Sequence, residues 1–306
     1  MEAALRTTRH DETRGLWLGL LGVLIFSLTL PMTRLAVGPA SDPQLPPLFV
    51  TAGRAGFAGL LSVLYLWFTG APRVQRRHLP ALLTSALRTV VGFPLSLSLA
   101  QREVDAMHAA VVTGLMPLAT AIGAALVFRQ RPSNGFWACA VLGCAMVLCF
   151  AAYKGSGRLS AADGLLLIAV FFTAVGYVSG ARVATELPAE QVICWVLVLS
   201  LPLTLPLTVA MWPARPVHAS AWGGFTYVTL FSMWLGFFAW YRGLALGGTV
   251  RVSQVQLVQP FLALLFAVPV LGEHLEPMTV LFSLAVIAVV FVSRKMPAQT
   301  LKPGTP

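Results

Sequence analysis

The sequence predicts an all-α integral membrane protein with ten transmembrane helices in two inverted five-helix repeats. Hydrophobic residues make up 57% of the 306 residues and charged residues only 10%, whereas a soluble domain carries roughly a quarter of its residues as charged side chains. Apolar runs of about 18 residues, long enough to cross a bilayer as a helix, recur along the whole chain. In addition, the second half of the chain repeats features of the first.

Ten apolar segments are expected to span the membrane. Their ranges are 15–35, 48–69, 79–99, 106–128, 134–153, 163–183, 190–211, 220–241, 249–271 and 276–293. The first follows a polar tail, 1–14, and no small-residue cleavage site ends it, so we expect it to be retained and not removed as a signal peptide. Proline, glycine and charged residues occupy several connections, and these residues favour turns over helix.

Lysine and arginine are distributed unevenly between the two sides of the predicted bundle. With a cytoplasmic N-terminus, fourteen of them lie in inside segments and five in outside segments. Cytoplasmic loops of membrane proteins carry an excess of these residues. The net charge of +10 therefore indicates orientation and not nucleic-acid binding. We expect both tails, 1–14 and 294–306, to be cytoplasmic.

The internal repeat has an offset of 143 residues, which places Pro117 on Pro260. Each proline is followed by an apolar run, a short polar turn and one more apolar span. The two repeats are expected over 15–153 and 163–293. Since each contains five spans, an odd number, the repeats must cross the membrane in opposite directions. Inverted repeats that meet at the bilayer midplane are typical of secondary transporters.

Two segments resemble the EamA-type branch of the drug/metabolite transporter superfamily. One is FVTAGRAGFAGLL, which contains Arg54, and the other runs from Pro260 through the turn Leu271 to Glu273 into the closing apolar helix. The likeness covers nearly the whole chain in architecture, although its motifs are short. The first half departs from the pattern, with Phe128 to Gln130 in place of the LGE turn. The resemblance implies export of small polar metabolites, such as amino acids or opine-type metallophores, across a bacterial inner (cytoplasmic) membrane.

Three glutamines crowd into the apolar stretch RVSQVQLVQP near the end of the chain. On an α-helix, Ser253, Gln256 and Gln259 share one stripe. Pro260 removes a backbone donor and strains the preceding turn, and freed polar groups persist in a membrane only where protein or water satisfies them. We therefore expect the stripe to line a wet cavity and bind substrate, with Pro117 and Pro260 as helix breaks. The alternative is that the amides form hydrogen bonds between helices.

Two arginines, Arg54 and Arg88, fall within predicted spans. A charge near a span centre costs about 2.5–3.5 kcal/mol on an insertion scale, so intramembrane ionisable residues are candidates for function. Both arginines are predicted to attract substrate carboxylates, and the alternative is that each caps carbonyls at a helix end. His108, near the start of the fourth span, and Tyr177, in the sixth, are further candidates for substrate binding. A histidine there can also be interfacial, and aromatic residues in spans are often packing residues.

The acidic residues constrain the function. None of the eleven lies in the middle third of a predicted span, so an interior with arginine and amides favours a carboxylate-bearing substrate and leaves the energy coupling open. No pairing of His, Asp, Glu or Cys has the spacing of an intramembrane hydrolase or a metal site. The four cysteines are interpreted as small apolar packing residues.

A secondary transporter that exports a small anionic or zwitterionic metabolite is therefore the leading prediction. Import or exchange of a small metabolite is the alternative, because gradients and not the fold set the direction. An integral-membrane enzyme or a scaffold is less favoured. The expected partners are a small-molecule substrate and the lipid bilayer, with a homodimer as one alternative to a monomer. No nucleic acid, cofactor or metal is expected.

Overall fold

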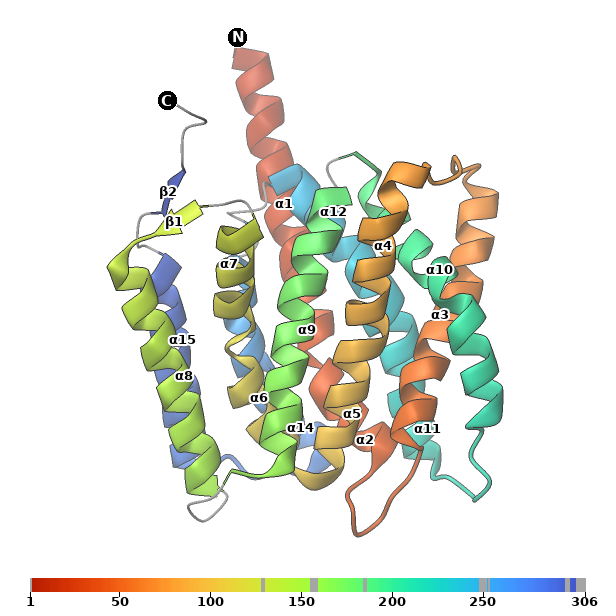
Figure 1. The fold of residues 1–306 in the computed structure, drawn as a ribbon, viewed down its shortest axis with the longest axis vertical. Coiled ribbons are helices and arrows are strands. Elements are labelled where there is room, and N and C mark those ends of the chain that lie inside the picture. Colours follow the sequence, from red (N-terminus) through yellow and green to blue (C-terminus); the bar gives the residue numbers. More distant parts are fainter. Residues whose placement is uncertain are drawn as a thin grey trace.

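The computed structural model describes residues 2–127, 130–154, 159–183, 186–247, 252, 254–294 and 298–300. Long helices run side by side and roughly parallel through one bundle (Figure 1). In the described part of the chain, strand is limited to the antiparallel pair β1 (Gln130–Pro132) and β2 (Ala298–Thr300). Helix is found in each of the ten predicted spans, so the predicted all-α membrane fold is confirmed.

The first half of the chain forms spans one to five. Its elements are α1 (Glu2–Ser27), α2 (Thr29–Val37), α3 (Pro47–Phe68), η1 (Arg76–His78), α4 (Leu79–Ser85), η2 (Ala86–Gly92), α5 (Phe93–Glu103), α6 (Ala106–Thr113), α7 (Met116–Val127) and α8 (Asn134–Lys154). Span one consists of α1 and α2, span three of η1 to α5, and span four of α6 and α7. The polar tail belongs to α1, so this helix begins well before the apolar segment.

The second half forms spans six to ten. Its elements are α9 (Ala161–Val183), α10 (Ala189–Ala210), α11 (Ala219–Tyr227), η3 (Val228–Leu235), α12 (Gly236–Gly247), η4 (Gln254–Val258), α14 (Gln259–Leu271) and α15 (Pro277–Arg294). Five helical stretches of the whole chain are long and apolar enough to cross a membrane by length and composition, and four further apolar helices have 10–17 residues.

Both halves interrupt their helices at matching places. The short π-helical segments η2 and η3 lie in spans three and eight, and such turns are rare outside functional sites. Spans four and nine, expected as continuous helices over 106–128 and 249–271, are both broken. A new α-helix begins at Met116 and at Gln259, one residue before a proline. The expectation of continuous helices was wrong, because proline suits the first turn of a helix but cannot continue a preceding one.

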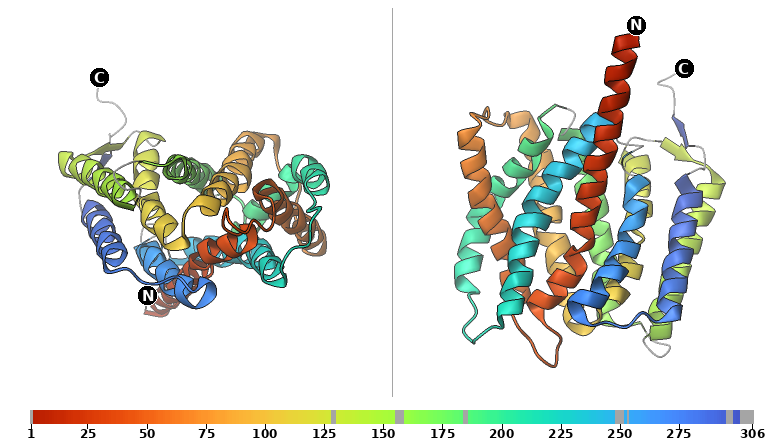
Figure 2. Two further views of the ribbon diagram at one scale, coloured as in Figure 1. Left: turned by 90° about the horizontal axis from the view of Figure 1, so that it is seen from below. Right: turned by 180° about the vertical axis from the view of Figure 1, so that it is seen from behind.

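The two halves interlock instead of forming separate bodies. Helix α1 packs along α12, and α3 packs along α10. At Gly243 an added Cβ would lie 2.7 Å from the Gly19 backbone nitrogen, so the small residues let α1 and α12 approach closely. The start of α1 and strand β2 lie at one end of the bundle, and loop 38–46 lies at the other (Figures 1 and 2).

Candidate functional site

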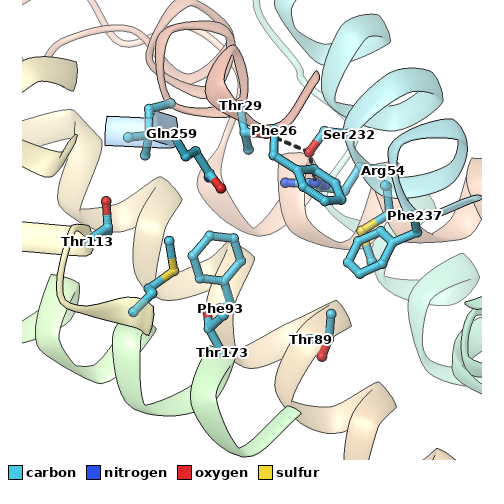
Figure 3. A pocket seen from close by; sticks show the side chains of 13 residues that line it. Phe26, Thr29, Arg54, Thr89, Phe93, Thr113, Thr173, Ser232, Phe237 and Gln259 are labelled. Carbon is cyan, nitrogen blue, oxygen red and sulfur yellow. Dashed lines mark hydrogen bonds between the residues drawn. The ribbon is translucent and has the colours of Figure 1, made fainter. Parts of the chain in front are cut away.

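A cavity with about 590 Å³ of unfilled space lies between the two halves. Seven different spans contribute to its wall. The lining residues are Phe26, Thr29, Leu30, Arg54, Thr89, Phe93, Thr113, Met116, Thr173, Ser232, Met233, Phe237 and Gln259 (Figure 3). A smaller space next to it shares Leu30, Thr113, Met116 and Gln259 and adds Gln256, Pro260 and Ala263.

The repeat brings matched positions to this cavity. Thr89 and Ser232 are 143 residues apart and come from the π-helical segments, and Met116 and Gln259 have the same offset and begin α7 and α14. All four side chains line the cavity. The irregular turns therefore shape the cavity from both sides, because they turn these positions toward the centre of the bundle.

Arg54 is the charged group of the cavity wall. It is 2% exposed, and its Nη2 donates to Ser232 Oγ at 3.0 Å. The same hydroxyl pairs with Thr29 Oγ1 at 2.8 Å (Figure 3). Within the described residues, the Arg54 Nε and Nη1 atoms are buried without a hydrogen-bond partner. A buried cation without a partner is costly, and a guanidinium presents paired donors that match a carboxylate.

The charge of Arg54 has no counter-ion in the cavity wall. Among the lining residues that the structure describes, none is acidic. Polar groups other than Arg54 are the hydroxyls of threonine and serine and the Gln259 amide. The site therefore presents one positive charge, several neutral hydrogen-bonding groups and no negative charge.

Aromatic rings form much of the remaining wall. The Phe26 and Phe237 rings meet edge to face, with centroids 5.1 Å apart, and Phe26 lies directly beside Arg54 (Figure 3). Phe93 lies across the cavity from Arg54 (Figure 3). An apolar group held between these rings would lose contact with water on most of its surface. The cavity thus has a cationic end and an apolar body.

The glutamine stripe is formed in part and has a different backbone from the one expected. Gln256 lies in the 3₁₀ segment η4 and Gln259 begins α14. Residues three apart on a 3₁₀ turn lie above one another, and both amides face the same cavity wall. Ser253 lies outside the described residues. The α-helical geometry expected for the stripe was wrong, since the chain tightens before Pro260.

Arg88 does not join this site. It lies in η2 and is half-buried, and its Nη1 lies 3.4 Å from the Thr84 carbonyl oxygen one turn back. The neighbouring Thr89 lines the cavity instead. The structure therefore brings Arg54, Gln256 and Gln259 together and leaves Arg88 apart. Tyr177 lies in α9, and its side chain, like that of Pro117, is outside the described part of the chain.

His108 has a partner that sequence reasoning missed. Its Nε2 lies 2.7 Å from Asp163 Oδ1, and the two side chains are only 8% and 5% exposed. His108 is therefore buried and not interfacial. The two residues are 55 positions apart, which no local pattern connects. A signal for half of this arrangement was present, because Ser160 and Asp163 have the spacing of a helix capping box.

Glu273, the acidic residue of the LGE turn, also has a role that the motif did not reveal. Its Oε1 accepts from the Ala106 amide at 2.8 Å, and its Oε2 accepts from the Met107 amide at 2.9 Å. Burial raises the pKa of this carboxyl, and the two amide donors oppose that effect. Glu273 thus caps the start of α6 and ties a loop of the second half to a helix of the first.

Comparisons with known proteins agree with this architecture. A family model described as the EamA-like transporter family matches residues 13–152 and 160–294. The chain is 41% identical over 290 residues to "Uncharacterized transporter YdeK" of Bacillus subtilis (strain 168), covering 93% of this chain and 99% of that protein. It also resembles a solved structure described as "Crystal structure of protein", with a TM-score of 0.63 and 17% identity over 92% of this chain and 98% of the other. This last likeness concerns the fold alone.

Proposed function

This chain belongs to the EamA-like transporter family, and from this premise we propose that it exports a small carboxylate with an apolar body. The protein is a multi-pass membrane transporter and not an enzyme. The proposal concerns the substrate and the direction of transport. One observation carries it: Arg54 is buried in the cavity wall with two nitrogens that have no partner among the described residues.

The substrate carboxylate is proposed to bind at Arg54. It would accept hydrogen bonds from guanidinium nitrogens that no described residue satisfies, beside the Ser232 and Thr29 hydroxyls. In a site without an acidic lining residue, the complex with a monoanion is neutral. Charge-assisted hydrogen bonds of this kind are roughly twice as strong as neutral ones.

The body of the substrate is proposed to lie against Phe26, Phe93 and Phe237. The space of about 590 Å³ falls in the range of small-molecule sites, which are mostly apolar with a few polar anchors. The Gln259 amide faces this space and offers both a donor and acceptors to an amine or hydroxyl of the substrate. Hydrophobic amino acids and related monocarboxylates fit this lining.

An opine-type metallophore is the second candidate, through the resemblance of the sequence to exporters of such compounds. These compounds carry several carboxylates, whereas the described cavity wall offers one cation. Each additional carboxylate would enter an apolar wall without a counter-ion, which is unfavourable. We therefore rank a monocarboxylate above a polycarboxylate.

Export across a bacterial inner membrane is proposed on the distribution of charge. Fourteen lysines and arginines lie on the side of the termini and five on the other, which favours cytoplasmic termini. The alternative, import or exchange, uses the same cavity with a different gradient.

Metabolite profiling inside and outside cells that lack or overproduce the protein tests the direction and the substrate class. Purified protein in liposomes then separates the classes directly, with leucine, phenylalanine and phenylpyruvate compared with arginine and citrate in counterflow. The proposal expects exchange of the first group and little exchange of arginine or citrate. Preference for citrate would favour the polycarboxylate reading, and intracellular depletion in the deletion strain would favour import.

A further inference from the structure

We propose that His108 and Asp163 form a proton-binding site that couples export to the proton gradient. The cavity explains substrate binding but contains no acid or histidine among its described lining residues. Uphill export needs a second, energy-supplying event. The inference goes beyond the substrate proposal, and only its second measurement rests on transport of a probe.

The geometry is that of a buried titratable pair. His108 is the third residue of α6 and Asp163 the third residue of α9, so the contact joins spans four and six. The pair is closed at 2.7 Å and both side chains are almost fully buried. The Phe150 ring lies 5.1 Å from the His108 ring and covers it. Buried ionisable residues in membrane proteins mark proton relays more often than packing sites.

Helix capping accounts for only one of the two Asp163 oxygens. Oδ2 accepts from the Ser160 amide at 2.8 Å and from the Ser160 hydroxyl at 2.7 Å. Oδ1 is directed to His108 Nε2. A cap needs no histidine, and a histidine needs no carboxylate to pack against a phenylalanine. The arrangement orients an imidazole with one nitrogen bound to a carboxylate, as in proton-transfer sites.

The other charged groups at this end of the bundle are engaged elsewhere. Arg34 of α2 lies 3.7 Å from Asp105, which precedes α6, and Lys154 of α8 lies 2.5 Å from Glu276, which precedes α15. Glu273 accepts from the amides at the start of α6. Two further groups, Arg102 and Glu103, close α5, and the Arg102 Nη2 donates to the Leu45 carbonyl. Among these described groups, only Asp163 bonds to the His108 ring.

The pair is linked to the cavity through the two helices that it joins. Five residues after His108, Thr113 lines the cavity, and ten residues after Asp163, Thr173 lines it. A change in the contact between α6 and α9 is therefore transmitted to both sides of the substrate site. Helix α6 is short and ends at a break before Pro117, so it can tilt without moving α7.

In the proposed cycle, neutral His108 donates from Nε2 to the Asp163 carboxylate. One external proton adds to Nδ1 and turns the pair from a net charge of −1 into a neutral imidazolium–carboxylate pair. The proton leaves to the cytoplasm when the cavity opens there, which restores the starting state. One proton enters for each substrate that leaves. Export of a monoanion then moves two charges per cycle, and export of a zwitterion moves one.

The first measurement needs no substrate. Potentiometric titration of the purified full-length protein between pH 8 and pH 5 counts bound protons. The wild type should bind about one proton more per chain than His108→Gln. Equal proton uptake by the two proteins would overturn the proposal, because the pair then does not titrate.

The second measurement separates coupling from transport. Liposomes contain the pH dye pyranine and either phenylalanine or leucine, and are assayed for counterflow and for accumulation driven by a pH gradient. Asp163→Asn, which keeps oxygen acceptors for the cap, and His108→Gln should retain counterflow within about twofold but lose gradient-driven accumulation by at least about tenfold. Glu276→Gln, which removes a carboxylate from the exposed Lys154 pair at the same end, is the matched control and should behave as wild type.

A clamp without a coupling role would give a different pattern. If both variants accumulate the probe as well as wild type does, or lose counterflow in the same proportion as accumulation, the coupling proposal is wrong. If the wild type carries neither probe, the substrate proposal has failed and the proton count alone decides the proton site.

Discussion

Spans four and nine occupy matching places in the two halves, and in each a new helix begins one residue before a proline. Their chemistry differs. In span four, Thr113 donates to the Ala109 carbonyl of its own helix at 2.7 Å, and the next position facing the cavity is apolar Met116. In span nine, the corresponding positions are Gln256 and Gln259. The second half thus offers two amides where the first offers a self-satisfied hydroxyl and a thioether.

The asymmetry runs the other way in spans two and seven. Arg54 of α3 reaches the cavity, and the position 143 residues later is Leu197, which is fully buried in the core of α10. The contact from Arg54 to Ser232 crosses between the halves. The comparison teaches that the duplicated backbone shapes the cavity, while unmatched side chains make its chemistry, because a polar substrate needs a directional site.

The largest effect is expected at Arg54. Arg54→Leu should lower the transport kcat/KM by at least about a hundredfold, because charge-assisted hydrogen bonds to the substrate are lost. The same change should leave thermal stability unchanged or raise it, since a buried, unpaired cation is replaced by an apolar side chain. Leu197→Met, at the matching position, is the control and should do neither. A destabilised but active Arg54→Leu protein would contradict the assignment.

A smaller loss is expected at the unmatched amide. Gln259→Leu should reduce transport by about tenfold, since a polar atom of the substrate loses its partner. Met116→Leu, at the matching position of the first half, should change it less than about twofold. Transport in liposomes at equal protein loading measures both. If the amide instead joins helices, stability in detergent should fall by about 0.6–2 kcal/mol with transport retained.

Glu273 gives the third effect, on stability and not on binding. Glu273→Ala should lower the free energy of unfolding by about 1–2 kcal/mol, because two amides at the start of α6 lose their cap. The exposed Glu276→Ala should have no measurable effect. Since burial raises the pKa of Glu273, the folded state binds its proton first. Wild type should therefore gain stability over Glu273→Gln as pH falls from 7 toward the ordinary glutamate pKa. Parallel melting curves would contradict this.

Arg88 should give the smallest effect. Its guanidinium lies near its own helix carbonyl and does not line the cavity. Arg88→Met should therefore change the transport rate by less than about threefold, in contrast to Arg54→Leu. The measurement is the same liposome assay at equal insertion. A hundredfold loss would mean that the cavity is rearranged during transport so that Arg88 reaches the substrate.

The spans, their number and the two proline breaks could be predicted from the sequence because each depends on nearby residues. Apolar length sets a membrane span, and proline acts on the helix turn before it. Arg54 and Gln259 could be named as candidates on the same ground, since a polar group in an apolar run needs a partner.

Which candidates meet was decided only by the tertiary structure. Arg54 and Arg88 look alike in sequence, yet packing turns one to the cavity and the other to its own helix. The partners of His108 and Ala106, which are Asp163 and Glu273, lie 55 and 167 residues away. The physical reason is range: helix formation and breaking are set within a turn or two, whereas a side chain's partner depends on which distant helices pack against it.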